Sequence, residues 1–276
     1  MKTILVPYEG HDRIEATLAT ACVFGRAFDS YIEAFPLSPP LSPFLAADTV
    51  GAPMVYDAAK LDAETKERYR LHFDAVMRAR YGEPATASGQ PRFRWTDEEP
   101  AGDAAVGSTA RVFDVTVVGR PGTSVTEPRM ATLEAALFDS GRPILIAPPE
   151  TPETIGRTIA IAWNRSPETA RAVAFAKPVL RAADKVFVIA TEGGSVPGPS
   201  GDALARYLRY NDIACELVEV GRTPNVGEAI LSEAARSGAD LVVKGAYTQS
   251  RLRQIIFGGA TRHLIYETTI PVLLAH

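Results

Sequence analysis

The chain has 276 residues, of which 46% are hydrophobic and 22% are charged, and its formal net charge is −4. This length favours two domains of about 140 residues, and the apolar share is enough for each to bury a core. The acidic balance argues against a general nucleic-acid binder or membrane-surface binder, since both need a basic face. No secretory signal is visible, and no run approaches the ~18 apolar residues of a membrane span. We therefore expect a soluble, cytoplasmic protein without nucleic-acid or membrane partners.

The first part of the chain alternates short apolar runs with amphipathic segments. The runs predict buried strands over residues 3–7 and 114–118, an edge strand over residues 91–95, and further strands over residues 31–37 and 143–147. The amphipathic segments predict helices over residues 11–28, 56–81, 100–111 and 129–139. Four prolines fall within residues 38–53, which we interpret as a loop, either a lid or a docking arm. Its apolar tip of Leu41, Phe44 and Leu45 favours docking onto another subunit, and a covered core is the alternative.

A Pro-rich linker at residues 148–153 separates this part from a second one, in which the pattern restarts. There we predict strands over residues 158–162, 185–190, 214–220, 241–243 and 270–274. We predict helices over residues 167–182, 203–210 and 226–236, and a last one after the glycine pair 258–259. Residues 240–243 echo residues 114–117, which indicates an internal duplication. We expect one domain at residues 1–149 (half one) and another at residues 150–276 (half two).

Alternating strands and helices, with strands of the buried type, predict an α/β fold with two doubly wound parallel sheets. In such sheets ligands bind at the carboxyl ends of the strands, where the strand order reverses. The strand ends to inspect are therefore residues 7–9, 162–164, 119 onward and 245 onward.

The connection between residues 241 and 264 has the parts of a phosphate cradle. A strand-like run ends at Gly245, and Gly258 and Gly259 stand just before a helical pattern. Glycines let the backbone approach an anion, and the free N–H groups and dipole at a helix start favour negative charge. An ordinary strand-to-helix connection is the alternative interpretation of the same glycines. Positive charge is added nearby by Arg251, Arg253 and Arg262.

These features together resemble the universal stress protein family in its tandem two-domain form, and the resemblance covers nearly the whole chain. The first strand leads into residues 6–10 (Val-Pro-Tyr-Glu-Gly) in half one and into residues 162–166 (Ala-Trp-Asn-Arg-Ser) in half two. In each half a fourth strand enters a glycine loop, and a Pro-led strand closes the domain. The resemblance implies a five-stranded parallel sheet per domain, of the adenine nucleotide alpha hydrolase-like, Rossmann-like type. It also implies that the two domains pack through their last strands, and it is compatible with a homodimer of the full chain.

The ATP-binding members of that family carry Gly-x2-Gly-x9-Gly-Ser/Thr after the fourth strand. In half two these positions hold Gly245, Thr248, Gly258 and Gly259. Thr248 thus replaces a glycine, and Gly259 removes a hydroxyl contact to phosphate but keeps the backbone N–H. In half one the same positions hold Gly119, Gly122, Thr132 and Leu133. Since the helix-start pair is lost there, half two is the candidate nucleotide site.

The family also places an acidic residue after the first strand, near the adenine. Here it is Glu9 in half one and Asn164 in half two, and Asn164 can still donate and accept hydrogen bonds at a base edge. A turn or helix-start role is the alternative for Asn164, and filling the strand end is the commoner role for Trp163. Ala190 or Thr191 would form the wall against the adenine. The resemblance therefore implies an ATP site, with or without Mg2+, made of Ala162, Asn164, Ala190, Gly245, Thr248, Arg251, Gly258, Gly259, Ala260 and Thr261.

Nothing in the sequence predicts efficient catalysis. The four histidines are scattered, with no acidic or nucleophilic partner at a telling spacing. His263 lies about one helical turn past Gly259 and could approach a phosphate, although a helix-surface or core role is the expected one. The two cysteines, Cys22 and Cys215, do not build a cluster with metal-ligand spacing, so we expect no metal.

The residues leave three functional hypotheses. The first is a universal stress response protein that binds ATP in half two as a regulatory ligand. The second is a nucleotide-free stress protein that acts through an unknown protein partner, as expected of family members that lack the glycine motif. The third and weakest is a slow ATPase. We place the first slightly ahead because residues 258–261 still form an open helix start.

Overall fold

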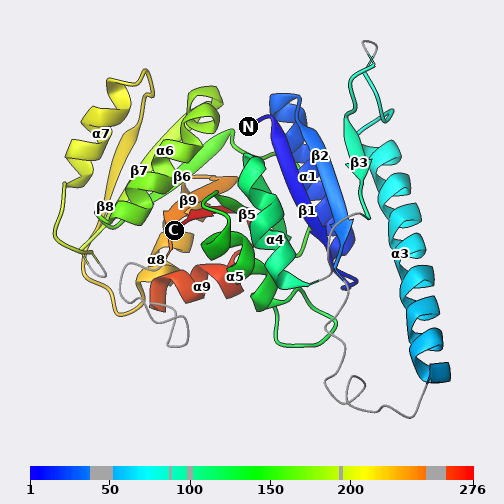
Figure 1. Ribbon diagram of the computed structural model, residues 1–276. Helices are drawn as coiled ribbons and strands as arrows, with labels where there is room; N and C mark the ends of the chain where they lie inside the picture. The colour runs from blue at the N-terminus through cyan, green and yellow to red at the C-terminus, as the bar shows by residue number, and fades with distance from the viewer. Residues whose placement is uncertain (38–51, 87–88, 98–101, 193–194, 247–258) are drawn as a thin grey trace.

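The computed structural model describes residues 1–37, 52–86, 89–97, 102–192, 195–246 and 259–276, and in the helix that begins at residue 52 it describes side chains from residue 63 (Figure 1). The Pro-rich loop prediction falls mostly on residues 38–51, which lie outside these ranges. No helix in the described ranges is both long and apolar enough to cross a membrane.

Half one contributes alternating strands and helices at positions close to those predicted. Its strands are β1 (Thr3–Tyr8), β2 (Tyr31–Pro36), β3 (Phe93–Trp95), β4 (Val115–Gly119) and β5 (Ile144–Ala147). Its helices are α1 (Ile14–Phe28), α3 (Ala52–Arg80), α4 (Asp103–Thr109) and α5 (Met130–Asp139), with a 3-10 turn at Ala110–Val112. The apolar central strands are buried along their length, because helices cover the sheet.

Half two repeats the alternation. Its strands are β6 (Thr158–Trp163), β7 (Lys185–Thr191), β8 (Glu216–Val220), β9 (Leu241–Gly245) and β10 (Val272–Ala275). Its helices are α6 (Pro167–Ala182), α7 (Gly201–Arg209), α8 (Val226–Arg236) and α9 (Gly259–Glu267). Three of these helices begin where the sequence supplies a capping side chain, because its oxygen accepts a hydrogen bond from an N–H group of the first turn. The caps are Ser166, Ser200 and Asn225.

The ten strands in the described part of the chain form one sheet in the order β3-β2-β1-β4-β5-β10-β9-β6-β7-β8. Among the strands of the described residues, pairing is parallel within each half, and β5 pairs antiparallel with β10, with Val272 opposite Ile146. The predicted doubly wound α/β fold is confirmed, and the two halves meet through their last strands. In each half the strand order reverses beside the first strand, which places one switch point between β1 and β4 and another between β6 and β9.

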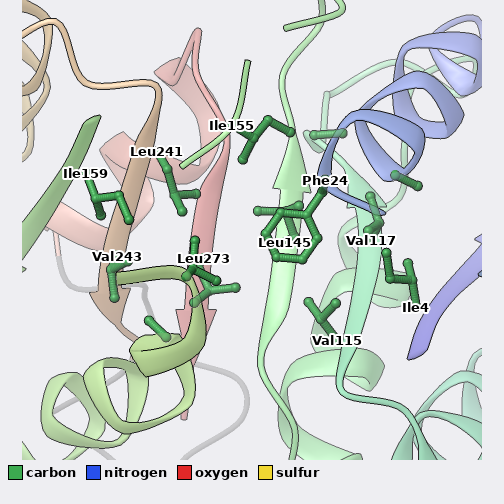
Figure 2. Close-up of a cluster of buried hydrophobic side chains, with 14 of the residues drawn as sticks. Ile4, Phe24, Val115, Val117, Leu145, Ile155, Ile159, Leu241, Val243 and Leu273 are labelled. Carbon is green, nitrogen blue, oxygen red and sulfur yellow. The ribbon is translucent and has the colours of Figure 1, made fainter. Parts of the chain in front are cut away.

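Helices cover both faces of the sheet. Phe24 of α1, Phe73 of α3 and Val173 of α6 pack on one face, and Leu133 of α5 and Leu264 of α9 pack on the other. Figure 2 shows the first of these layers running across the junction of the halves, from Ile4 through Leu145 and Leu273 to Ile159. The two halves therefore share a continuous apolar core.

Candidate functional site

The switch point of half two lies where the ends of β6 and β9 meet the start of α6. Asn164 follows β6, and its Oδ1 accepts hydrogen bonds from Ser166 N at 3.3 Å and from Thr169 Oγ1 at 2.6 Å. Ser166 Oγ in turn accepts from Thr169 N at 3.1 Å and caps α6. The carbonyl oxygen of Asn164 therefore serves a turn at the helix start, one of the two roles expected for it. Its contact to a base stays a prediction.

Gly245 ends β9 against the backbone of α6. A β-carbon on Gly245 would lie 2.2 Å from Thr169 N and 2.5 Å from Glu168 C, so only glycine fits without a shift. Gly245 N also donates a hydrogen bond to Thr169 Oγ1 at 3.2 Å. The sequence analysis interpreted Gly245 as a residue that lets the backbone approach a phosphate. The structure shows that glycine is also required here for the packing of β9 against α6, which the local sequence did not reveal.

Residues 195–200 lie over the end of β6. Trp163 is 5% exposed, and its Nε1 donates to Pro199 O at 3.0 Å, so the side chain fills the strand end, as expected. Val196 N donates to Asn164 O at 3.2 Å. A β-carbon on Gly198 would lie 2.6 Å from Arg165 O, which shows how closely the segment approaches the turn.

The two alanines predicted for the base pocket lie at the same strand ends. Ala162 is buried in the core, at 2% exposure. Ala190 is half-buried and faces the start of α7, where a β-carbon on Gly201 would lie 3.0 Å from its Cβ. Ala162, Asn164, Ala190 and Gly245 thus all lie at the carboxyl ends of the parallel strands of half two.

The start of α9 supplies the remaining described site residues. Gly259 is exposed, and among the described residues no atom lies within 4 Å of the position that a β-carbon would take there. Ala260 is half-buried and Thr261 is buried. The other predicted residues, Thr248, Arg251 and Gly258, lie outside the described residues.

A cleft of about 390 Å³ runs along α9 from its first residue. Arg262 is exposed on its rim, with its guanidinium carbon 5.8 Å from the ring centre of Tyr266. His263 packs against α8, since a β-carbon on Gly227 would lie 2.6 Å from His263 Cβ. The packing role expected for His263 is therefore what its contacts indicate. The cleft is lined by Thr123, Gly259, Arg262, His263, Tyr266 and Glu267.

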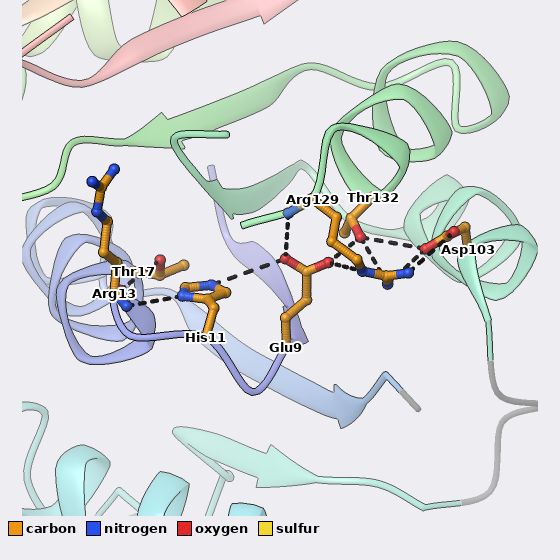
Figure 3. Close-up of polar contacts among 7 residues, drawn as sticks. All are labelled: Glu9, His11, Arg13, Thr17, Asp103, Arg129 and Thr132. Atoms are coloured by element: carbon orange, nitrogen blue, oxygen red, sulfur yellow. Dashed lines mark hydrogen bonds and ion pairs between the residues drawn. The ribbon is translucent and has the colours of Figure 1, made fainter. Parts of the chain in front are cut away.

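The corresponding edge of half one is filled by side chains, as Figure 3 shows around Glu9. Glu9 is 7% exposed and accepts hydrogen bonds from Arg129 Nε at 2.9 Å, from Arg129 N at 3.3 Å and from Thr132 Oγ1. Arg129 Nη2 also donates to Asp103 Oδ1 at 2.8 Å. Burial raises the pKa of Glu9, and the bonds from Thr132 and Arg129 act in the opposite direction. The Glu9 carboxylate therefore occupies the start of α5.

His11 lies beside this cluster and stays neutral near pH 7. Burial, and then the charge of Arg13, lower the pKa of His11 to about 4. Its Nδ1 accepts a hydrogen bond from Arg13 N at 3.1 Å, and its Nε2 lies 4.0 Å from Glu9 Oε2.

The loop after β4 is also filled. A β-carbon on Gly119 would lie 2.6 Å from Pro128 Cγ, and one on Gly122 would lie 2.0 Å from Glu127 Oε2. Leu133, in the hydroxyl position of the family motif, is fully buried in the core. These contacts fill the loop of half one, and the assignment of the nucleotide site to half two stays a prediction.

Several residues of interest escaped the sequence analysis. Glu127, Asp103 and Arg129 carry no spacing signal, because their contacts depend on how the loops fold back. Lys244 did leave a signal, as the one charged residue in the apolar run of β9. It is 3% exposed, its Nζ donates to Gly245 O at 3.3 Å, and burial lowers its pKa to about 8. Within the described ranges, no three His, Cys, Asp or Glu side chains are placed to hold a metal ion.

Comparisons with known proteins agree with this architecture. The sequence profile of the Universal stress protein family matches residues 156–276. The stress response protein NhaX of Bacillus subtilis (strain 168) is 40% identical over 47 residues, which are 17% of this chain and 28% of the length of that protein.

Two solved structures share the fold over nearly the full length. A universal stress protein from Archaeoglobus fulgidus DSM 4304 superposes with a TM-score of 0.70 at 15% identity, over 99% of this chain and 95% of its own. A functionally unknown protein from Pseudomonas aeruginosa PAO1 superposes with a TM-score of 0.57 at 12% identity, over 100% of this chain and 92% of its own.

Proposed function

Residues 156–276 belong to the universal stress protein family, and we propose that the protein binds one ATP in half two as a regulatory ligand. The observation that carries this proposal is the start of α9, where Gly259 is exposed, no atom of the described residues lies within 4 Å of its β-carbon position, and Arg262 stands on the cleft rim. Helix-start N–H groups with adjacent positive charge are what a phosphate chain needs. The proposal includes the domain division at residues 1–149 and 150–276.

In this proposal the N–H groups at Gly259, Ala260 and Thr261 face the phosphates, and Mg2+ would accompany them as a counter-charge. Gly258 belongs to the same proposed site by the family motif, and Thr248 and Arg251 belong to it as auxiliary groups. In this proposal ATP is a bound ligand and not a reactant, so its role is regulatory and not catalytic.

The adenine would lie at the ends of β6 and β7, between Ala162, Asn164 and Ala190. Because residues 195–200 cover the end of β6, this mode of binding requires that segment to move. If residues 195–200 uncover the end of β6 in only a fraction of the molecules, the apparent Kd for ATP equals the Kd of the open form divided by that fraction.

Substitutions at Gly259 test the proposal without a clash against the described residues, none of which lies within 4 Å of its β-carbon position. Gly259→Asp places a carboxylate against the phosphates and should weaken ATP binding at least tenfold, since about 1.4 kcal/mol of repulsion suffices for that. An aspartate in the first turn also favours the helix itself, so a folding defect is not expected. Gly259→Ser restores the hydroxyl of the family motif and should tighten binding.

The measurement is calorimetric titration of the metal-depleted chain with ATP, and then with ATP plus Mg2+. Gly259→Ala is the matched control and should keep the wild-type affinity. The proposal is supported if the wild type binds ATP at one site per chain, Gly259→Ser binds ATP more tightly than the wild type, and Gly259→Asp binds it more weakly. Equal affinity of the Asp variant and the wild type would remove the phosphate site from the start of α9.

A second candidate function is favoured by the covered end of β6. Trp163 Nε1 donates a hydrogen bond to Pro199 O, and Asn164 Oδ1 is used in a turn. Both contacts occupy the end of β6 with groups of the chain itself, as expected of a nucleotide-free protein that acts through a protein partner. No heat and no thermal shift with ATP would favour this function, and crosslinking of the full chain in the cytoplasm would then identify a homodimer or another partner. A slow ATPase is tested in the same mixtures by release of phosphate.

A further inference from the structure

One edge of the sheet is a strand with a single neighbour. Among the described strands, β8 ends the order and pairs with β7 alone. At the opposite edge β3 has three residues, and α3 packs against it through Phe73 and Phe93 (Figure 1). An edge strand presents a row of backbone N–H and C=O groups that another strand can bind. β8, with five residues and no proline, is therefore the edge that can accept a further strand.

The hydrogen bond at the end of β8 shows which of its backbone groups face outward. Glu192 N, directly after β7, donates to Val220 O at 3.1 Å, so the backbone groups of Val220 face β7. The N–H and C=O groups of one residue point to the same side of a strand, and that side alternates from residue to residue. The backbone groups of Val218 therefore also face β7, whereas those of Leu217 and Glu219 face the free edge.

The side chains of Leu217 and Glu219 lie on the α7 face of the sheet, together with that of Cys215. Leu217 packs under the start of α7, since a β-carbon on Gly201 would lie 2.6 Å from Leu217 Cδ1, and alternation places Glu219 on the same face. Burial raises the pKa of the Cys215 thiol, and the charge and a hydrogen bond of Arg209 act in the opposite direction. Arg209 therefore lies beside Cys215, and the exposed side chains of Arg209 and Glu219 stand at opposite ends of β8.

A two-fold axis at Leu217 would match this edge to a second copy of itself. In an antiparallel pair centred there, Leu217 of one copy lies opposite Leu217 of the other, and Cys215 lies opposite Glu219. These residues present outward backbone groups, so each pair can exchange both of its hydrogen bonds. Opposite side chains share a face, with their β-carbons about 5 Å apart. Arg209, beside Cys215, is thereby brought within reach of Glu219 of the second copy.

We propose that β8 pairs antiparallel with β8 of a second copy of the chain, so that two chains form a homodimer with one continuous sheet. The opposite charges of Arg209 and Glu219 then meet twice, as the symmetry of such an interface requires. No glutamate faces a glutamate in this register, because Glu216 lies opposite Val218. Since the edge itself carries both members of the charge pair, it fits a second copy better than a strand of another protein. The interface does not depend on nucleotide binding.

The test is sedimentation velocity of the full chain over a range of concentrations, and the wild type should show a concentration-dependent dimer. Arg209→Glu and Glu219→Arg each place like charges at both contacts, and each should weaken the dimer by at least about tenfold. Mixed in equal amounts, the two variants restore opposite charges at both contacts, so they should form a heterodimer with close to the wild-type affinity. Lys177→Glu is the control with the same change in net charge as Arg209→Glu. Because Lys177 lies over the ring of Tyr207, on the α6 side of α7, this variant should dimerise like the wild type.

Hydrogen exchange of single amides in the wild type locates the contact independently. The N–H groups of Leu217 and Glu219 should become protected as the chain concentration rises, whereas that of Val218, which faces β7, should exchange slowly at every concentration. A wild type that stays monomeric would overturn the proposal and leave this edge to a strand of another protein. A dimer that survives both charge reversals would equally overturn it, as would folded single variants that fail to associate when mixed.

Discussion

Replacement of Gly245 by alanine tests whether this glycine is needed for packing. The added methyl group would lie 2.2 Å from Thr169 N and 2.7 Å from Thr169 Cα. Both atoms belong to the backbone of the first turn of α6, so no side-chain rotation can relieve the contact. Either β9 or the start of α6 must move, and the bond from Gly245 N to Thr169 Oγ1 would move with them.

The expected loss of stability follows from these two contacts. Overpacking of a dense core costs about 1–3 kcal/mol, and a backbone obstacle places Gly245→Ala at the upper end of that range. Weakening of one hydrogen bond adds about 1 kcal/mol, so we expect a total near 3–4 kcal/mol. At about 2–4 °C per kcal/mol, the melting temperature should fall by roughly 10 °C. Gly259→Ala, whose methyl group meets no atom of the described residues within 4 Å, should be neutral or stabilise by up to about 1 kcal/mol.

Urea unfolding followed by circular dichroism measures the difference between the two alanine variants. An unfolding midpoint of Gly245→Ala equal to that of Gly259→Ala would refute the close approach of β9 to α6. Unchanged stability of Gly245→Ala, combined with lost ATP binding, would show that Gly245 acts at the phosphates instead.

Two further predictions concern polar side chains, one of them buried and the other half-buried. Burial and the charge of Arg13 lower the pKa of His11 from its ordinary value near 6.5 to about 4. Between pH 6.5 and 4 the unfolded chain therefore binds more protons than the folded chain. The free energy of unfolding should fall by up to about 3 kcal/mol as the pH drops through that window. His11→Gln should remove this part of the pH dependence in urea titrations, and an unchanged slope would contradict the assignment. Asp240→Ala should cost about 2 kcal/mol, because part-buried N–H groups of Gly156 and Thr158 lose a charged acceptor, and Asp240→Asn should lose less. Equal unfolding midpoints for the Ala variant and the wild type would argue against this role. The donors to Asp240 are Thr154 Oγ1 and the backbone N of Gly156, Arg157 and Thr158.

The positions of most helices and strands could be predicted because their signals are local. α6 illustrates this, since Ser166 caps it, Pro167 suits its first turn, and the observed bounds coincide with the predicted residues 167–182. The identity of the strand ends that form the candidate site also followed from the sequence, since a parallel sheet with short connections brings those ends to one edge. The site residues at the start of α9 came from the family motif rather than from physical necessity.

What a residue does at those ends was decided by the tertiary structure. Gly245 has the spacing of a phosphate-binding glycine, yet its contact is with Thr169, 76 positions away. Glu127 lies in a loop without periodicity, and it acquires a role only when the chain folds its carboxylate onto Thr123 and Ser124. The sequence alone determined the pattern of elements, because hydrophobic period and capping residues act over a few positions. Contacts between distant segments depend on how the helices and strands pack, and a single sequence carries no local signal for them.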